Sequence, residues 1–486
     1  MEVPVHRVGG THRAVRARAV LALAALFFGA ASASSQDAQY WNIQYGPVAQ
    51  LLGGQVVGST RDLSATYYNP GGLALARDPG FLFSVQGFKA DMLSLKPLDA
   101  GPFPSFSQTT YSTFPGFVAV AFPQRWFGER THLAFSILTR QQLNVRVDER
   151  LAADALPPAL LPLSPGRSGR YGLESLFDQR MRETWVGLTF SRRLSDSVGL
   201  GATLFGVHRG QRTRWEESLQ IAYADGSGVS VLAVDDFNYS HARLLGKVGL
   251  AWEGGATRLG LAVTSPSAGL FGTGKAGFTR SVAGANLAVA GSGGTVLVNG
   301  LDENLDASYR SSWAVAGGGA WRRRSLQIHA STEWFAPVPR FTVLSGLEDP
   351  SLGTPLTLSQ DLRSVLNAGL GVEYWLGGVS ASQGPKSGGT ALYGAFATDL
   401  SASPDVVRGE AASSNQSWYH FTAGTAFGVG SSRFSLGVDY AFGSKDREIV
   451  FGALPGGLPV IGDGRRLNVR STRWVFVLGY LFGPRR

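Results

Sequence analysis

The sequence predicts an all-β fold: a transmembrane antiparallel β-barrel of about 14 strands, with an N-terminal plug, or hatch, in its lumen. Stretches of roughly ten residues that alternate apolar and polar side chains recur along the chain. The connections between these stretches alternate short and long. The composition is rich in glycine (64 residues), contains 11% aromatic residues and is poor in charge (16%), which suits closely packed strands that face lipid.

The first 33 residues have the pattern of a signal peptide. Four arginines between positions 7 and 18 precede an apolar run over 19–29, and Ala31-Ser32-Ala33 matches a cleavage site. We therefore expect residues 1–33 to be removed and the mature chain to start near Ser34. A short membrane anchor is the alternative. Mean hydropathy of +0.02 argues against a helical membrane protein, which needs apolar runs of about 20 residues.

Residues 34–79 are predicted to form the hatch. Glycine and proline are frequent there, and Asn69-Pro70-Gly71-Gly72 is typical of a turn. Asn69 can cap this turn with its side chain while Pro70 fixes φ, so that a kinked segment with a gating role is expected at Asn69, Pro70 and Gly71. A turn with no gating role is the alternative.

Residues 80–486 are predicted to form the barrel. The connections after the second, fourth, sixth, eighth and twelfth strands are short, and barrels have short periplasmic turns and long outer loops, so both chain ends are expected on the periplasmic side. An even number of strands is typical of single-chain bacterial barrels. The predicted strands cover residues 80–90, 116–123, 130–146, 180–191, 198–216, 238–253, 257–264, 307–322, 325–336, 363–376, 390–398, 417–428, 432–442 and 467–482.

The two faces of the strands predict what lies on either side of the wall. In the last strand Trp474, Phe476 and Leu478 form an apolar outer face, as lipid requires. Val475 and Val477 on the opposite face are also apolar, which suggests that something packs inside the barrel.

Two groups of residues are candidates for ligand binding. The predicted outer loop near 152–163 is unusually apolar, and Leu156, Leu160 and Leu161 form an exposed patch of the kind that marks binding sites. Packing against neighbouring loops is the alternative. Arg243, Lys247 and Arg310 face the predicted lumen, where they can hold a carboxylate head group. Pairing with plug carboxylates is the alternative for these cations.

Charge and motifs exclude several function classes. The net charge of +9 is spread thinly and forms no basic stripe, so phosphates of outer-membrane lipid and lipopolysaccharide are expected partners rather than nucleic acid. Solvation of the cationic side chains at strand ends is the alternative. Cysteine is absent. Glycines over 272–277 satisfy G-x-G-x-x-G, but no helix follows, and we interpret them as loop glycines. No hydrolase, metalloprotease or P-loop signature occurs, so we expect no catalytic residue, metal or cofactor.

Short motifs resemble the FadL/OmpP1/TodX family of outer-membrane transporters for long-chain fatty acids and other hydrophobic compounds. Asn69-Pro70-Gly71-Gly72-Leu73-Ala74 is similar to the Asn-Pro-Ala-Gly-Leu-Ala of the family's hatch, with Gly71 in place of alanine. The segment 259–266 looks like its Gly-x-x-Tyr-x-Ser-Pro segment but lacks the tyrosine. Segments 370–374, 393–396 and 403–405 are similar to its late strands.

The resemblance implies a monomeric, non-enzymatic uptake channel in the cell outer membrane. A hydrophobic ligand is captured among outer loops, passed to a pocket in the lumen and released by hatch movement through a lateral opening. The aromatic C-terminal strand resembles the signal that outer-membrane assembly machinery recognises. A general porin or structural barrel is the alternative, and an outer-membrane lipid hydrolase is a third possibility.

Overall fold

A computed structural model describes residues 33–34, 39–76, 80–97, 105–123, 128–156, 166–284, 296–350, 354–376, 389–403, 416–429, 432–448 and 466–482. Within these residues no helix is long and apolar enough to span a membrane. The predicted signal peptide and its cleavage site lie almost wholly outside the described residues, as do Leu160 and Leu161.

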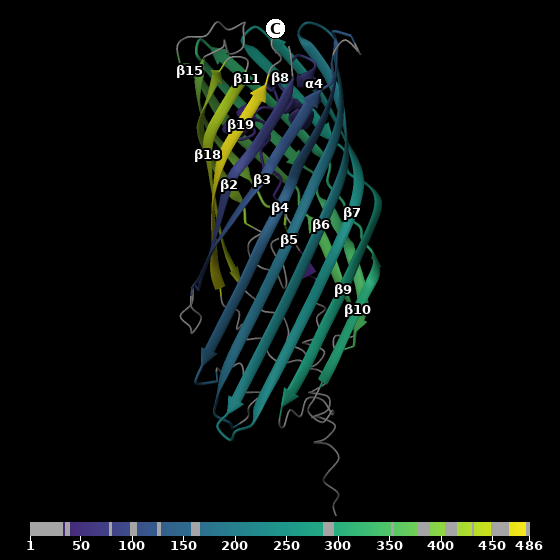
Figure 1. Cartoon of the computed structure of the whole chain (residues 1–486), viewed down its shortest axis with the longest axis vertical. Coiled ribbons are helices and arrows are strands. Elements are labelled where there is room, and N and C mark those ends of the chain that lie inside the picture. Colours follow the sequence, from purple (N-terminus) through teal and green to yellow (C-terminus); the bar gives the residue numbers. More distant parts are fainter. Residues whose placement is uncertain are drawn as a thin grey trace, which may run out of the picture.

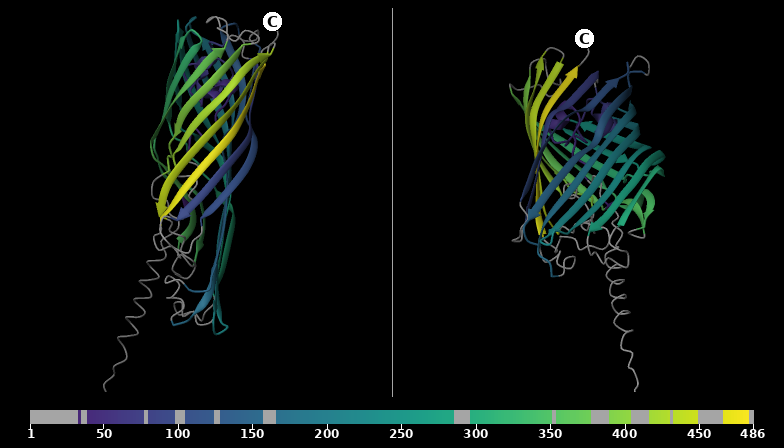
Figure 2. Two further views of the ribbon diagram at one scale, coloured as in Figure 1. Left: turned by 90° about the vertical axis from the view of Figure 1, so that its left-hand side faces the viewer. Right: turned by 60° about the horizontal axis from the view of Figure 1, so that its bottom comes forward.

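The strands close into a single antiparallel barrel, which the left view of Figure 2 shows from the side. Most wall strands pair with their neighbours along the chain, β12 pairs with β15, and β19 closes the ring against β2. The barrel strands are β2 (Phe81–Pro97), β3 (Phe106–Ala121), β4 (Thr131–Ala153), β5 (Gly169–Arg193), β6 (Val198–Tyr223), β7 (Gly228–Gly254), β8 (Thr257–Thr264), β9 (Ala268–Gly284), β10 (Val296–Asp306), β11 (Ala314–Arg323), β12 (Leu326–Phe335), β15 (Val365–Leu376), β16 (Thr390–Asp399), β17 (Trp418–Val429), β18 (Ser432–Glu448) and β19 (Arg466–Phe482).

Two positions in the barrel wall are each occupied by two successive strands; we call each such position in the wall a stave. β8 and β9 pair with successive parts of β7, so together they act as one stave interrupted at residues 265–267. β11 and β10 continue this arrangement, since β11 pairs with β8 and β10 with β9. Sixteen wall strands therefore make fourteen staves, and the predicted barrel is confirmed.

The predicted boundaries fail mainly at the end of the barrel away from the C-terminus. Strands β4 to β7 are 23 to 27 residues long, and they extend well beyond β18 and β19 at the bottom of Figure 1. The supposed outer loop after residue 264 contains β9 and β10, and the strand predicted over 307–322 starts only at Ala314. The glycines over 272–277 lie in β9, so their interpretation as loop glycines was wrong.

A second small sheet was missed by the sequence patterns. β13 (Val338–Asp349) and β14 (Thr354–Leu362) form a hairpin, and β14 also pairs with the two-residue strand β1 (Ala33–Ser34). Phe341, Leu344 and Leu358 are buried in a cluster with Phe237 and Tyr239, which are buried side chains of β7. The hairpin therefore folds into the outer half of the lumen instead of extending the wall.

The outer face is apolar as predicted. On β19, Trp474, Phe476 and Leu478 are between 41% and 48% exposed, whereas Val475 and Val477 are buried in a cluster shared with hatch residues. On β7, Val248 and Leu250 are exposed while Arg243 and Lys247 are buried. The alternation thus separates a lipid-facing belt from a filled interior.

The N-terminal segment lies inside the barrel, close to its upper end in Figure 1. It contains three short helices, α2 (Pro47–Leu51), α3 (Ala65–Tyr68) and α4 (Pro70–Leu73). Almost every residue between 45 and 74 is buried. We call residues 39–76 the hatch.

Wall glycines allow the hatch backbone to approach the strands closely. A Cβ atom at Gly249 would lie 2.1 Å from the Asn69 side-chain oxygen, and one at Gly201 would lie 2.4 Å from the Pro70 carbonyl oxygen. Each of these contacts is too short for any larger residue. The same holds around the ring, at Gly199, Gly260, Gly318, Gly369, Gly371, Gly424, Gly437 and Gly479. We call this set of ten glycines the glycine ring.

Candidate functional site

A cavity of about 60 Å³ lies in the lumen against the hatch. Three of the predicted ligand-binding residues, Arg243, Lys247 and Arg310, line it together. Leu156 does not: it packs against a separate apolar cluster that includes Tyr171 and Leu219. We call this cavity the basic chamber, because its lining contains four cationic side chains and two carboxylates: Arg140, Arg243, Lys247, Arg310, Glu183 and Glu333.

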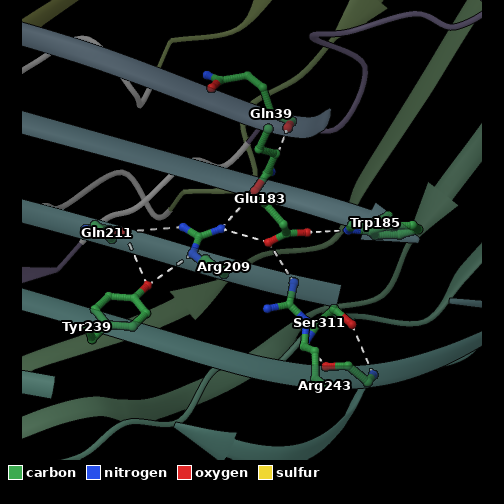
Figure 3. A network of polar contacts seen from close by, with 10 residues as sticks. Gln39, Glu183, Trp185, Arg209, Gln211, Tyr239, Arg243 and Ser311 are labelled. Carbon is green, nitrogen blue, oxygen red and sulfur yellow. Dashed lines mark hydrogen bonds and ion pairs between the residues drawn. The ribbon is translucent and has the colours of Figure 1, made fainter. Parts of the chain in front are cut away.

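Glu183 of β5 is the centre of a buried polar network (Figure 3). Its Oε2 accepts hydrogen bonds from Arg209 Nη1 at 3.1 Å and from Arg243 Nη2 at 2.7 Å. Its Oε1 accepts one from Trp185 Nε1 at 2.7 Å. The Tyr309 ring lies under both guanidinium groups, 4.1 and 4.6 Å from their carbons. Glu183 thereby connects strands β5, β6 and β7 at one level along the barrel axis.

Two arginines that line the chamber have unpaired donors. Arg140 is 5% exposed and Arg243 only 1%. Among the described residues, Arg140 Nη1 and the Nε and Nη1 of Arg243 have no hydrogen-bond partner. An unpaired buried donor costs about 1–3 kcal/mol, and more when charged. An anion in the chamber would remove this cost, so the arrangement is suited to bind a carboxylate end group.

The hatch forms one wall of the chamber. Lys247 Nζ donates a hydrogen bond to the Tyr67 carbonyl at 2.8 Å and lies 4.6 Å from the Tyr67 ring. Trp41 Nε1 donates to Glu333 Oε2 at 2.7 Å. Burial raises the pKa of Tyr67 to about 12, so its hydroxyl is neutral at physiological pH. The hatch therefore adds an aromatic surface next to the cations.

At the end of the barrel that has the short turns, ion pairs connect the hatch to the wall. Arg61 Nε lies 3.2 Å from Glu253 Oε2, and Arg258 lies 3.1 Å from the other oxygen of this carboxylate. Burial and the nearby Arg258 lower the pKa of Arg61 to about 10, although Glu253 acts in the opposite direction. Arg61 remains protonated at neutral pH, and the contact persists.

Asn69 joins the hatch to the wall and caps the turn, as predicted for its side chain. Its Nδ2 donates to the Val57 carbonyl at 2.9 Å and to the Leu250 carbonyl of β7 at 3.0 Å. Its Oδ1 accepts a hydrogen bond from Gly71 N at 3.1 Å, so that Asn69 is also the N-cap of α4. Pro70 occupies the first turn of this helix.

Replacement of Asn69 by aspartate tests this junction. Asn69→Asp keeps the oxygen that accepts the hydrogen bond from Gly71 N. The second carboxylate oxygen cannot donate to the carbonyl oxygens of Val57 and Leu250 and is repelled by them, so each lost hydrogen bond should cost about 1–3 kcal/mol. We expect faster amide hydrogen exchange over residues 47–73 of the purified protein. Asn144→Asp, at an exposed wall position, is the control and should leave exchange unchanged. Equal exchange in both variants would show that Asn69 does not hold the hatch.

A seam opens in the wall beside the chamber. β3 pairs with β4 only over Phe117–Ala121, whereas residues 106–116 pair with β2 alone and residues 139–153 of β4 pair with β5 alone. β3 can be followed beside β4 in Figure 1. Pro115 lacks an N–H group to donate, and β4 has a bulge at Arg140, so both edges depart from regular pairing where the seam begins.

The seam lies next to both the chamber and the lipid-facing belt. Arg140 and Gln141, at the β4 edge, both line the chamber. Tyr45 of the hatch donates a hydrogen bond from its hydroxyl to the Thr139 carbonyl at 2.8 Å. On β2, Phe88 is 42% exposed and pairs in register with Phe476 of the belt. The seam therefore lies at the height of the lipid-facing side chains.

Sequence reasoning missed Arg140, Glu183 and Glu333. Glu183 and Glu333 lie on the polar faces of predicted strands, so alternation alone could have placed them in the lumen. The inward position of Gln141 depends on the bulge, which has no clear sequence signal. Within the described residues no group of acidic or histidine side chains could hold a metal ion.

Comparison with known proteins identifies the fold. No family model matches the chain, and no curated protein sequence does. A Pseudomonas aeruginosa FadL homologue is similar in structure, with TM-score 0.55, 12% identity and coverage of 92% of this chain and 100% of the other. The P. putida toluene transporter TodX gives TM-score 0.55 and 13% identity, covering 91% of this chain and 99% of the other. The CymD monoaromatic hydrocarbon channel gives 0.51 and 11%, covering 91% and 98%. The chain therefore has the fold of these channels, as the resemblance to the FadL/OmpP1/TodX family implied.

Proposed function

We propose that this protein is a passive outer-membrane uptake channel for hydrophobic molecules that carry an anionic end, such as a long-chain fatty acid. The observation that supports this most directly is the basic chamber, where buried guanidinium donors without partners meet aromatic side chains beside a seam in the wall. The structurally similar channels include a toluene transporter and a FadL homologue, which agrees with a hydrophobic cargo.

The proposed route runs from the outer side to the chamber and then sideways. Arg310 is exposed and lines the chamber, so it can meet an incoming carboxylate before the buried Arg140 and Arg243 do. The alkyl or aromatic part leaves through the seam into the lipid belt. A cavity of about 60 Å³ is far smaller than the roughly 300–1,000 Å³ of ligand pockets. Loading therefore requires the hatch residues beside Tyr67 to move.

We infer further that the protein lies in an outer membrane as a monomer. The strands of the wall close into a ring, and the exposed apolar belt suits lipid. Insertion would depend on the outer-membrane assembly machinery and on removal of residues 1–33. A general porin would need an open polar lumen, whereas hatch residues here contact strands around most of the ring. We infer no catalytic role, since the similar structures are channels.

The experiment that tests this proposal compares an acid with its neutral analogue. Arg140→Ala removes a buried cation with an unpaired donor, so the loss of one charge-assisted hydrogen bond should weaken fatty-acid binding about tenfold or more. Binding of the fatty alcohol of equal length should hardly change. Arg146→Ala, on the same strand with a half-exposed side chain, is the matched control.

Two readouts decide between the candidate functions. Fluorescent fatty-acid binding to the purified protein reports the chamber, and mass spectrometry of extracted lipid reports any co-purified lipophile. Equal loss of acid and alcohol binding would mean that the chamber does not recognise the charge. A protein that binds neither compound and conducts small ions in a planar bilayer would contradict the proposal and favour a polar pore.

A further inference from the structure

A group of arginines lies on the outer face of the wall just beyond the lipid belt. On β5 the outward side chains of Phe190, Leu188 and Val186 are between 40% and 51% exposed. Continuing along the same face, Thr184 is followed by the exposed arginines Arg182 and Arg180. The change from apolar to cationic side chains therefore occurs within four residues on one strand.

These arginines surround a shallow opening. Gly210 of β6 pairs directly with Arg182, and Arg212 pairs directly with Arg180. A Cβ atom at Gly210 would meet nothing within 4 Å, so this position is open to the outside. Gln142, Ser240 and Asn238 are further outward-facing polar residues at the same two levels of β4 and β7. We call Arg180, Arg182, Gly210 and Arg212 the arginine cradle.

The charge of the cradle is not balanced within the described chain. Arg180 is 3.3 Å from Asp178. Neither Arg182 nor Arg212 forms an ion pair with a described residue. Like charges directly opposite each other in an antiparallel pair are destabilising, and diagonal neighbours about 7–8 Å apart still interact through long side chains. An anion over Gly210 would offset the positive charge of Arg182 and Arg212.

The position of the arginine cradle along the membrane normal indicates which anion is available to bind there. On the same face of β5, the exposed Arg192 lies at the other end of the apolar stretch, ten residues from Arg182. Ten residues of strand span about 34 Å, which a tilt of about 40° reduces to roughly 26 Å along the membrane normal. The apolar band of an outer-membrane barrel is about 25 Å tall. The cradle thus lies at the level of lipid head groups, on the side away from the short turns, where outer-leaflet lipid is expected.

We propose that the arginine cradle binds a phosphate group of an outer-leaflet glycolipid, with the phosphate over Gly210 between Arg182 and Arg212. Arginine is suited to this because its planar guanidinium binds phosphate oxygens in pairs. This inference rests on the proposed placement in an outer membrane and does not depend on the cargo of the basic chamber.

The test uses the purified full-length protein and bisphosphorylated lipid A as the probe, with native mass spectrometry to measure binding. The double variant Arg182→Gln/Arg212→Gln should weaken lipid A binding about tenfold or more, since two charge-assisted hydrogen-bonding groups are lost. Arg150→Gln/Arg170→Gln removes the same charge from exposed positions nearer the strand tips and should leave the affinity within about twofold. Equal weakening in both double variants would overturn the proposal, because it would indicate net charge alone.

Gly210 provides a second and sharper comparison. Gly210→Glu places a carboxylate in the open cradle and should abolish lipid A binding, while the similarly sized Gly210→Gln should retain part of it. Dephosphorylated lipid A should bind weakly to every variant, and inorganic phosphate alone should not compete at millimolar concentration. Undiminished binding of dephosphorylated lipid, or competition by free phosphate, would contradict a lipid phosphate site. Fatty-acid binding measured on the same variants should be unchanged, which separates this proposal from the uptake function.

Discussion

Replacing Glu183 by alanine should destabilise the barrel more than any other single change in the basic chamber. The variant leaves Arg209 and Arg243 buried without the carboxylate that both contact, and each is at most 1% exposed. Removal of one partner from a buried ion pair costs about 3–5 kcal/mol, because the remaining charges stay desolvated. We expect a clearly lower midpoint of urea unfolding in detergent micelles, followed by tryptophan fluorescence.

The control for this prediction is a carboxylate on the same strand. Glu174→Ala breaks an ion pair with Arg150 at 2.8 Å, but the two side chains are 46% and 70% exposed. Exposed pairs contribute only about 0–1 kcal/mol, so the unfolding midpoint should hardly move. Glu183→Gln should fall between the two, since an amide oxygen still accepts one guanidinium hydrogen bond. If Glu174→Ala and Glu183→Ala were equally destabilising, burial of the network would not be the cause.

The staves of the barrel were predictable because alternation is a local property. In β12, Ile328 and Trp334 are exposed while Gln327 and His329 are buried, as the two-residue period requires. The inner hairpin of β13 and β14 has the same local chemistry as a wall strand, so no local pattern distinguishes a strand that folds into the lumen. β9 was missed for a different reason, since its glycine-rich sequence carries weak periodicity.

The basic chamber was predictable only in part. The inward positions of Arg243 and Lys247 follow from alternation, but their meeting with Glu183 depends on the register between β5, β6 and β7. The bulge at Arg140 is a second obstacle. Strict alternation from Leu138 would turn Arg146 inward, whereas Arg146 is exposed and Gln141 is buried. One extra residue thus reverses the faces of the outer half of β4.

The tight fit of the hatch predicts a large effect of Gly249→Val on channel closure. A Cβ at this position would lie 2.1 Å from Asn69 Oδ1 and 2.8 Å from the Pro70 ring, and the backbone of β7 cannot retreat without breaking its pairing with β6 and β8. The α4 helix must therefore move away from β7. We expect the variant to conduct ions in a planar bilayer where the unaltered protein is closed.

Gly394→Val is the matched control for this substitution. Gly394 is also a wall glycine, on β16, but a Cβ there would meet nothing within 4 Å. The two variants carry the same side-chain change in the same kind of strand, so a difference between them isolates contact with the hatch. If Gly249→Val conducts ions and Gly394→Val does not, the close fit of the hatch against the glycine ring keeps the lumen closed. A closed Gly249→Val channel would mean that the hatch can shift within the barrel without opening a path, and release of ligand would then depend on the seam between β3 and β4 alone.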